Sequence, residues 1–99
     1  METVQVKLDE DGKGRFYIEE GQEFTGEMEV DVHDGLLTVY HTEVSDKAQG
    51  RGYARLLLKA MVDYARKNSL KVKPLCSFVH AQFKRHPGEY ADIWQKKEA

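Results

Sequence analysis

The sequence predicts an α+β fold with a mixed sheet, in which antiparallel strands come first and a β-α-β unit with one parallel strand pair follows. Two observations predict it. Apolar and polar residues alternate, as in half-buried strands, through most of residues 1–44. Residues 50–68 then repeat their apolar positions every three or four residues, which is typical of an amphipathic helix. A strand on each side of this helix would form a parallel pair.

Four strands are expected in the first half of the chain, at residues 3–9, 15–20, 27–33 and 36–44. The segments between the first three, 9–14 and 19–26, leave room only for turns. Between the third and fourth strands, Asp34-Gly35 is typical of a two-residue hairpin loop.

This hairpin fixes a register, and the register predicts an unusual strand end. Val30 would lie opposite Val39, and Met28 opposite His41. Because side chains of one face alternate along a strand, His41 and Glu43 would then continue the apolar face of the sheet. Two titratable groups would extend a core face toward the end of strand 36–44.

The second half of the chain predicts helices around one strand. The helix 50–68 buries one face, made of Tyr53, Leu56, Leu57, Ala60, Met61, Tyr64 and Ala65. Residues 70–76 indicate a short strand, with Pro74 marking a bend or an edge near its end. Residues 77–86 suit a helix with Ser77 near its N-cap, and 89–97 suit a last short helix.

Length and composition indicate one domain, residues 1–99, with a modest core. A single cysteine, no secretory signal and no apolar run of membrane-spanning length favour a cytoplasmic protein without a membrane partner. The chain carries a net charge of −2 and has no motif that reads RNA or DNA, which argues against nucleic acid as a partner.

Charge is divided unequally along the chain. Residues 1–46 hold 3 Lys and Arg against 13 Asp and Glu, a balance of −10. Residues 47–99 hold 12 against 4, a balance of +8. The basic half begins at a glycine-containing loop and would attract a polyanionic ligand, although charges that only cover solvated faces would give the same count.

That loop, "KAQGRGYARLLL" at 47–58, indicates an anion site. Gly50 and Gly52 precede the long helix, whose first amide N–H groups have no partner within the helix. Glycines there would let a phosphate approach those groups closely, and Lys47, Arg51 and Arg55 would add positive charge. A tight turn is the alternative. The spacing fits neither the P-loop nor the dinucleotide fingerprint.

The segment "QGRGYA" (49–54) resembles the Gln/Arg-x-x-Gly-x-Gly/Ala signature of the Gcn5-related N-acetyltransferase superfamily, with Gln49, Gly52 and Ala54 at its fixed positions. Together with "HTEV" (41–44), "PLCSFV" (74–79) and "RHPGEY" (85–90), it is similar to the compact acetyltransferase-like subfamily of about this length. The resemblance covers roughly residues 15–95. Larger members carry helices between their first strands, for which this chain has no room.

The resemblance implies a bound acetyl-coenzyme A. Its pyrophosphate would lie on the backbone amides of the loop, formed by Gln49, Gly50, Arg51, Gly52, Tyr53 and Ala54. Its pantetheine arm would enter a gap where strands 36–44 and 70–76 part, and an N–H near Val44 would face the thioester oxygen. The acceptor, an amine or a thiol, and the oligomeric state stay open.

Three residues are candidates for the chemistry. His41 or Glu43 could accept a proton, or could be a hydrogen-bonded pair at the edge of the core. Cys76, between a strand and a helix N-terminus, could take up the acetyl group as a thiolate, or could be a small buried apolar residue. The subfamily carries a cysteine in this Pro-x-Cys setting. No metal site is expected, and a coenzyme A-binding module without turnover is the alternative function.

Overall fold

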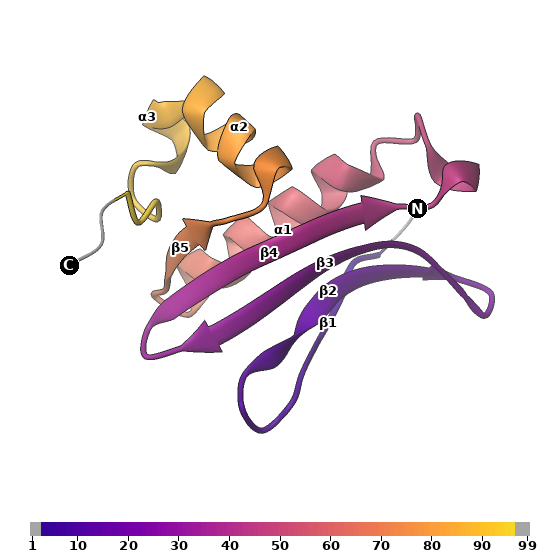
Figure 1. Cartoon of the computed structure of the whole chain (residues 1–99), viewed down its shortest axis with the longest axis horizontal. Helices are drawn as coiled ribbons and strands as arrows, with labels where there is room; N and C mark the ends of the chain where they lie inside the picture. Colours follow the sequence, from indigo (N-terminus) through magenta and orange to yellow (C-terminus); the bar gives the residue numbers. More distant parts are fainter. Residues whose placement is uncertain (1–2, 97–99) are drawn as a thin grey trace.

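The computed structural model describes residues 3–96 and has the predicted α+β architecture (Figure 1). Five strands form one sheet in the order β1-β2-β3-β4-β5, with antiparallel neighbours up to β4 and a parallel β4–β5 pair. The elements are β1 (Gln5–Leu8), β2 (Lys13–Glu20), β3 (Glu23–His33), β4 (Leu36–Val44), the 3₁₀ turn η1 (Asp46–Ala48), α1 (Tyr53–Lys67), β5 (Lys71–Pro74), α2 (Ser77–Arg85) and α3 (Pro87–Tyr90).

The β3–β4 hairpin closes as its sequence predicts. Asp34 and Gly35 have φ angles of 53° and 80°, the left-handed pair that a type I′ turn requires. The register that follows is also confirmed as far as Val30 opposite Val39. Beyond that point the ladder departs from the prediction, because β4 contains one extra residue.

The extra residue is Tyr40, which forms a β-bulge: Val30 pairs with Val39, but Glu29 pairs with His41. From there on the alternation of faces is reversed. The prediction that His41 and Glu43 continue the core face is therefore wrong, and their side chains are 57% and 69% exposed. Thr42 and Val44 are partly buried in their place.

The core lies between the sheet and the helices. Figure 1 shows α1 crossing behind the sheet, where it packs against β2, β3 and β4. The ten largest side chains that are almost fully buried there are Ile18, Met28, Val30, Leu37, Val39, Leu57, Met61, Val72, Val79 and Phe83. Each such side chain contributes about 1.5–3 kcal/mol relative to exposure, so these residues set the position of everything built on them.

The long helix is shorter and more widely buried than its periodicity predicts. It begins at Tyr53, not at residue 50, because Gly50 and Gly52 have φ angles of 83° and 78°, which a right-handed helix excludes. Leu58 and Val62 are buried in addition to the predicted face, since they lie toward α2 and α3.

Strand lengths also differ from the prediction. β3 starts at Glu23, so the segment 19–26 is mostly strand, with Gly21 and Gln22 alone between β2 and β3. Thr25 is buried there, and its hydroxyl donates to the carbonyl of Ile18 over 3.3 Å. β1 is four residues long and, at the sheet edge, leaves Val6 42% exposed.

The C-terminal region keeps one predicted helix and replaces the other. The N-cap of α2 is Cys76 in extended conformation, and Ser77, expected near the N-cap, is the first helical residue. The helix expected at 89–97 is a single turn, α3, and position 97 lies outside the described residues. After it, the chain runs beside β5: the Val72 amide donates to the Ile93 carbonyl (2.6 Å), and the Gln95 amide to that of Val72 (2.8 Å).

Candidate functional site

The glycine loop presents several backbone amides without a protein partner. Within residues 3–96, the N–H groups of Gly50, Gly52, Ala54 and Arg55 donate no hydrogen bond. A β carbon at Gly50 or Gly52 would meet no heavy atom within 4 Å. The two glycines are therefore needed for their left-handed backbone, and the space in front of them is open to a ligand.

A hollow of about 330 Å³ lies over this loop, between the end of β4, the start of α1 and α2. The residues that line it come from these elements, from η1 and from the loop itself: Val44, Ala48, Gln49, Gly50, Gly52, Tyr53, Ala54, Arg55, Phe78 and Gln82. Of the residues proposed from the sequence to bind a coenzyme, the structure brings all but Arg51 to this hollow.

Val44, which lines the hollow, belongs to a part of β4 that has an unpaired edge. Pairing between β4 and β5 runs from Leu36 with Lys71 to Val39 with Pro74 and stops there, although β4 extends to Val44. The two strands thus part at the bulge, as the family resemblance implies for strands 36–44 and 70–76.

The backbone of Val44 faces this open edge. The Ser45 amide donates to the Thr25 carbonyl (2.9 Å), so Ser45 points toward β3. Because successive residues of a strand point to opposite sides, the N–H and C=O of Val44 point away from β3. The side-chain amide of Gln49 donates to the Val44 carbonyl over 2.9 Å, which leaves the Val44 N–H for a ligand.

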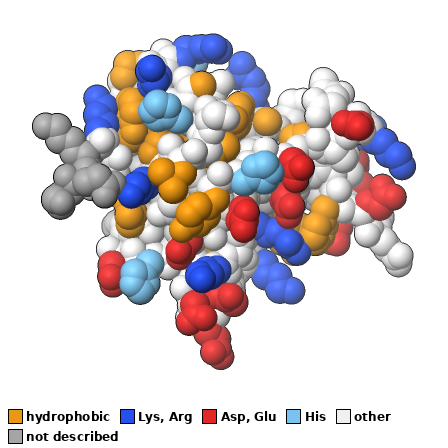
Figure 2. Space-filling model, viewed as in Figure 1, with side chains coloured by type: hydrophobic (Ala, Val, Ile, Leu, Met, Phe, Trp, Pro, Cys, Tyr) orange, Lys and Arg blue, Asp and Glu red, His pale blue; other side chains and the backbone are white. Residues whose placement is uncertain are grey.

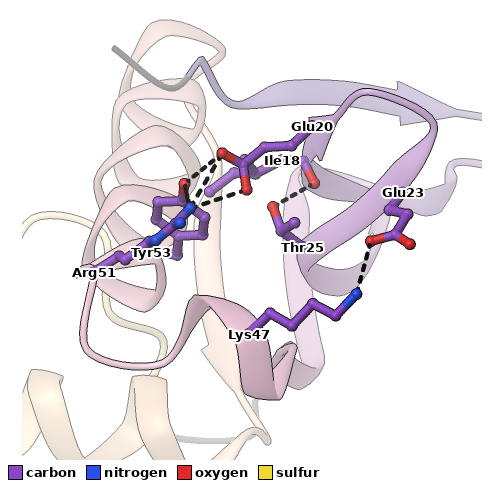
Figure 3. Close-up of polar contacts among 7 residues, drawn as sticks. All are labelled: Ile18, Glu20, Glu23, Thr25, Lys47, Arg51 and Tyr53. Atoms are coloured by element: carbon purple, nitrogen blue, oxygen red, sulfur yellow. Dashed lines mark hydrogen bonds and ion pairs between the residues drawn. The ribbon is translucent and has the colours of Figure 1, made fainter.

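The positive side chains near the loop are arranged differently from the prediction. The Arg51 guanidinium turns toward β2, where its Nη1 lies 3.1 Å from Glu20 Oε1, as Figure 3 shows. Lys47 points at Glu23, with 4.0 Å between nitrogen and oxygen. Arg55 alone of the three expected cations lines the hollow.

Cys76 lies at the point where β5 has left the sheet and α2 begins. It is buried, with an exposed fraction of 6%, and its amide donates to the Val39 carbonyl over 2.9 Å. Its Sγ is 3.2 Å from the hydroxyl of Thr42. The sequence did not indicate Thr42, because a regular β4 would have turned it to the other face.

His41 and Glu43 form a pair on the opposite, open face of the sheet. Their nearest atoms, Nε2 and Oε1, are 3.5 Å apart. Since Thr42 faces Cys76, the side chains on either side of it point away from the thiol. The structure therefore does not bring the three candidates for the chemistry together.

Charge is unevenly spread over the surface. On the face in Figure 2, Asp and Glu side chains are scattered over the sheet, whereas Lys and Arg dominate at the top, over α2. Within residues 3–96, no three His, Cys, Asp or Glu side chains are grouped to hold a metal ion. The helices of this described region are all too short or too polar to span a bilayer.

The sequence profile of the GCN5-related N-acetyl-transferase family matches residues 15–93, which run from within β2 to beyond α3. The chain belongs to this family. Members of the family in general use acetyl-coenzyme A and an acceptor substrate. The match confirms the resemblance seen in the loop, and it extends over most of the chain.

Individual proteins agree with this membership. Protein NATD1 of Xenopus tropicalis is 34% identical over 65 residues (66% of this chain and 53% of the relative), and human NATD1 is 35% identical over 52 residues (52% and 46%). The chain spans about half the length of the curated relatives that it matches. A solution structure of a GCN5-like candidate N-acetyltransferase from Staphylococcus aureus has a TM-score of 0.67 at 33% identity, covering 95% of this chain and 90% of its own.

Proposed function

We propose that the protein binds acetyl-coenzyme A in the hollow over the glycine loop and transfers its acetyl group to an amine or thiol acceptor. One observation carries the proposal: the N–H groups of Gly50, Gly52, Ala54 and Arg55, four residues that line the hollow, have no hydrogen-bond partner in residues 3–96. Unpaired amides at a helix N-terminus fit a pyrophosphate, which needs several donors and no opposing carboxylate.

The coenzyme would supply a thioester whose carbonyl carbon is open to attack. The chain would contribute position and polarity. Gln49 fixes the Val44 carbonyl, and the Val44 N–H, directed to the parted edge of β4, donates to the oxygen on which negative charge develops. His41, beside Glu43 on the open face of the sheet, takes the proton of an acceptor that arrives from that side.

Cys76 provides a second route for the acetyl group. In this route its sulfur forms a bond to the acetyl carbon, the bond to the coenzyme sulfur breaks, and the thiol proton leaves with the coenzyme. Thr42, at 3.2 Å, would hold the Cys76 thiol in place. Because Cys76 is buried, its thiol would be reached only by a ligand that already lies in the gap.

Binding and transfer are tested separately. Titration calorimetry of the protein with acetyl-coenzyme A should give a dissociation constant, and release of free coenzyme A should accelerate with a suitable amine. The intact mass after incubation should rise by one acetyl group in the wild type and not in Cys76→Ser if the cysteine route operates. No heat at millimolar ligand would refute the binding proposal.

A coenzyme A-binding module without turnover is the alternative. The observation that favours it is the shortness of the β2–β3 connection, where Gly21 and Gln22 stand in place of the helices that larger superfamily members use beside the acceptor. Tight binding of acetyl-coenzyme A, with no coenzyme A released over a broad panel of amines and no acetylated Cys76, would decide for the module.

A further inference from the structure

The carboxylate of Glu20, on β2, is hydrogen-bonded to two side chains at the glycine loop. Glu20 accepts hydrogen bonds from Arg51 Nη1 at 3.1 Å (Oε1) and 3.2 Å (Oε2), and from the Tyr53 hydroxyl at 3.0 Å. Arg51 Nη1 also donates to the Tyr53 hydroxyl over 3.0 Å. Figure 3 shows the three side chains meeting above the start of α1, so that residues 31 and 33 positions apart in the sequence are linked.

The direction of Arg51 decides where the amides point. Gly50 and Gly52, on either side of it, line the hollow, whereas Arg51 does not. The side chain is thus held on the sheet side while the flanking backbone is presented to the ligand side. Two glycines with left-handed φ angles would otherwise allow the loop many conformations, since glycine is the least restricted residue.

We propose that Glu20 is a positioning residue for the coenzyme: by anchoring Arg51 and Tyr53, it holds the glycine loop in the conformation in which its amides converge on the pyrophosphate. The proposal rests on the proposed function and deepens it. A ligand binds more weakly when its binding-competent loop is only partly populated, and the anchor removes that loss.

Electrostatics alone predicts the opposite change in affinity when Glu20 is neutralised. Glu20 is negative, and its charge acts over about 8 Å at physiological ionic strength, so neutralising it should strengthen the binding of a phosphate nearby. Weaker binding after neutralisation would therefore report lost positioning, not lost charge. Glu23, on the other side of the same turn, is the matched control, because its one ion pair among the described residues is with Lys47 at 4.0 Å and both side chains are well exposed.

The experiment compares two ligands across a set of variants. Dissociation constants of acetyl-coenzyme A and of S-acetyl-pantetheine, which lacks phosphates, are measured by calorimetry for the wild type, Glu20→Gln, Glu23→Gln, Arg51→Gln and the Glu20→Gln/Arg51→Gln double variant. We expect Glu20→Gln to bind acetyl-coenzyme A about fivefold more weakly, the scale of a well-formed exposed ion pair, and S-acetyl-pantetheine as the wild type does. Glu23→Gln should bind both ligands like the wild type.

The double variant tests whether Glu20 acts on the loop through Arg51. If Glu20 acts through Arg51, the Glu20→Gln change should weaken binding no further in the Arg51→Gln background. Thermal unfolding identifies any variant that does not fold, and Glu20→Asp, which keeps the charge but shortens the side chain, then replaces Glu20→Gln in the comparison. Unchanged or tighter acetyl-coenzyme A binding by Glu20→Gln, or an equal loss for both ligands, overturns the inference alone. A wild type that binds no acetyl-coenzyme A overturns the proposed function and this inference with it.

Discussion

Glycines of the same backbone conformation have different roles in this protein. Gly52 and Gly35 have φ angles of 78° and 80°, and a β carbon at either would meet no heavy atom of the protein within 4 Å. Gly35 closes a hairpin, whereas Gly52 stands before amides that have no partner in residues 3–96. Strain at the two positions should be similar, so any difference between them reports the ligand.

We therefore expect Gly52→Ala and Gly35→Ala to lose about the same stability, roughly 1–2 kcal/mol, because each forces an L residue into the left-handed region. Only Gly52→Ala should weaken acetyl-coenzyme A binding, by about tenfold or more, since its methyl group would take space that the phosphate needs. Chemical denaturation and calorimetry measure the two effects. Equal affinities in the two variants would contradict the proposed position of the pyrophosphate.

Among single residues, those whose role depends on the local backbone could be predicted from the sequence. Residues 49–54 line the hollow apart from Arg51, because they are consecutive in the loop before α1, and a glycine pair ahead of a helical period marks that loop in the sequence. Thr42 could not be found in this way. Its contact with Cys76 depends on a bulge that reverses the faces of β4, and period-two alternation cannot contain that reversal.

At the scale of elements, the bulge in β4 separates two environments. Before Tyr40 the strand pairs on both sides, and after it only with β3. Tyr40 is itself 45% exposed and donates to Asp31 over 3.2 Å. Partial burial and the Asp31 carboxylate raise the pKa of the Tyr40 hydroxyl above its ordinary value. The extra backbone residue marks the point where β4 and β5 part, and the ring of Tyr40 is not what separates them.

Deleting Tyr40 should test this division. The pairs Val39 with Val30 and His41 with Glu29 can both persist without it, so a regular ladder can form and the fold should survive. A bulge bends and twists its strand, and its loss should narrow the gap beside β5 and abolish coenzyme binding. Circular dichroism would check the fold and calorimetry the binding.

Tyr40→Ala is the control for this deletion, because it keeps the bulge and removes only the ring and its hydrogen bond to Asp31. It should bind acetyl-coenzyme A within about twofold of the wild type, since this surface side chain does not line the hollow. A deletion variant that is folded and binds normally would show that the gap does not depend on the bulge.

The order of elements could be predicted from the sequence because each has a strong local signal. The hairpin at Asp34-Gly35 and the periodicity of α1 are examples. The prediction of a helix at 89–97 was wrong because of a tertiary contact. Its apolar residues Tyr90 and Ile93 are buried as expected, but Val72 at the edge of β5 offers backbone hydrogen bonds that a longer helix would have left unused.

On the scale of the whole molecule, the acidic and basic halves of the chain meet at the glycine loop. Glu20 and Glu23 of the first half face Arg51 and Lys47 of the second. Much of the positive charge that the sequence places near a phosphate is thus engaged by the sheet. Recognition of an anion there should depend on backbone amides more than on cationic side chains, and should respond weakly to salt.

The far end of α1 holds the C-terminal segment by a second contact. Arg66 donates to both carboxylate oxygens of Asp92, at 3.0 and 3.1 Å, and to the Glu89 carbonyl at 2.7 Å. Lys71 donates to the Asp92 carbonyl over 2.7 Å. These bonds keep residues 89–95 beside β5 and cover its edge, which would otherwise expose unpaired backbone groups.

The ion pair of Arg66 and Asp92 should make the stability of the fold depend on pH. The hydrogen bond from Arg66 lowers the pKa of the Asp92 carboxyl below its ordinary 3.8. A carboxyl whose pKa is lower in the folded state stabilises that state fully above the unfolded-state pKa, and its contribution disappears as pH falls through the folded-state value. Asp92→Asn should therefore melt roughly 1–4 °C below the wild type at pH 7, and the difference should vanish well below pH 3.8. In an Arg66→Gln background the same substitution should leave the melting temperature unchanged at both pH values, and a persistent difference would place the effect outside this pair.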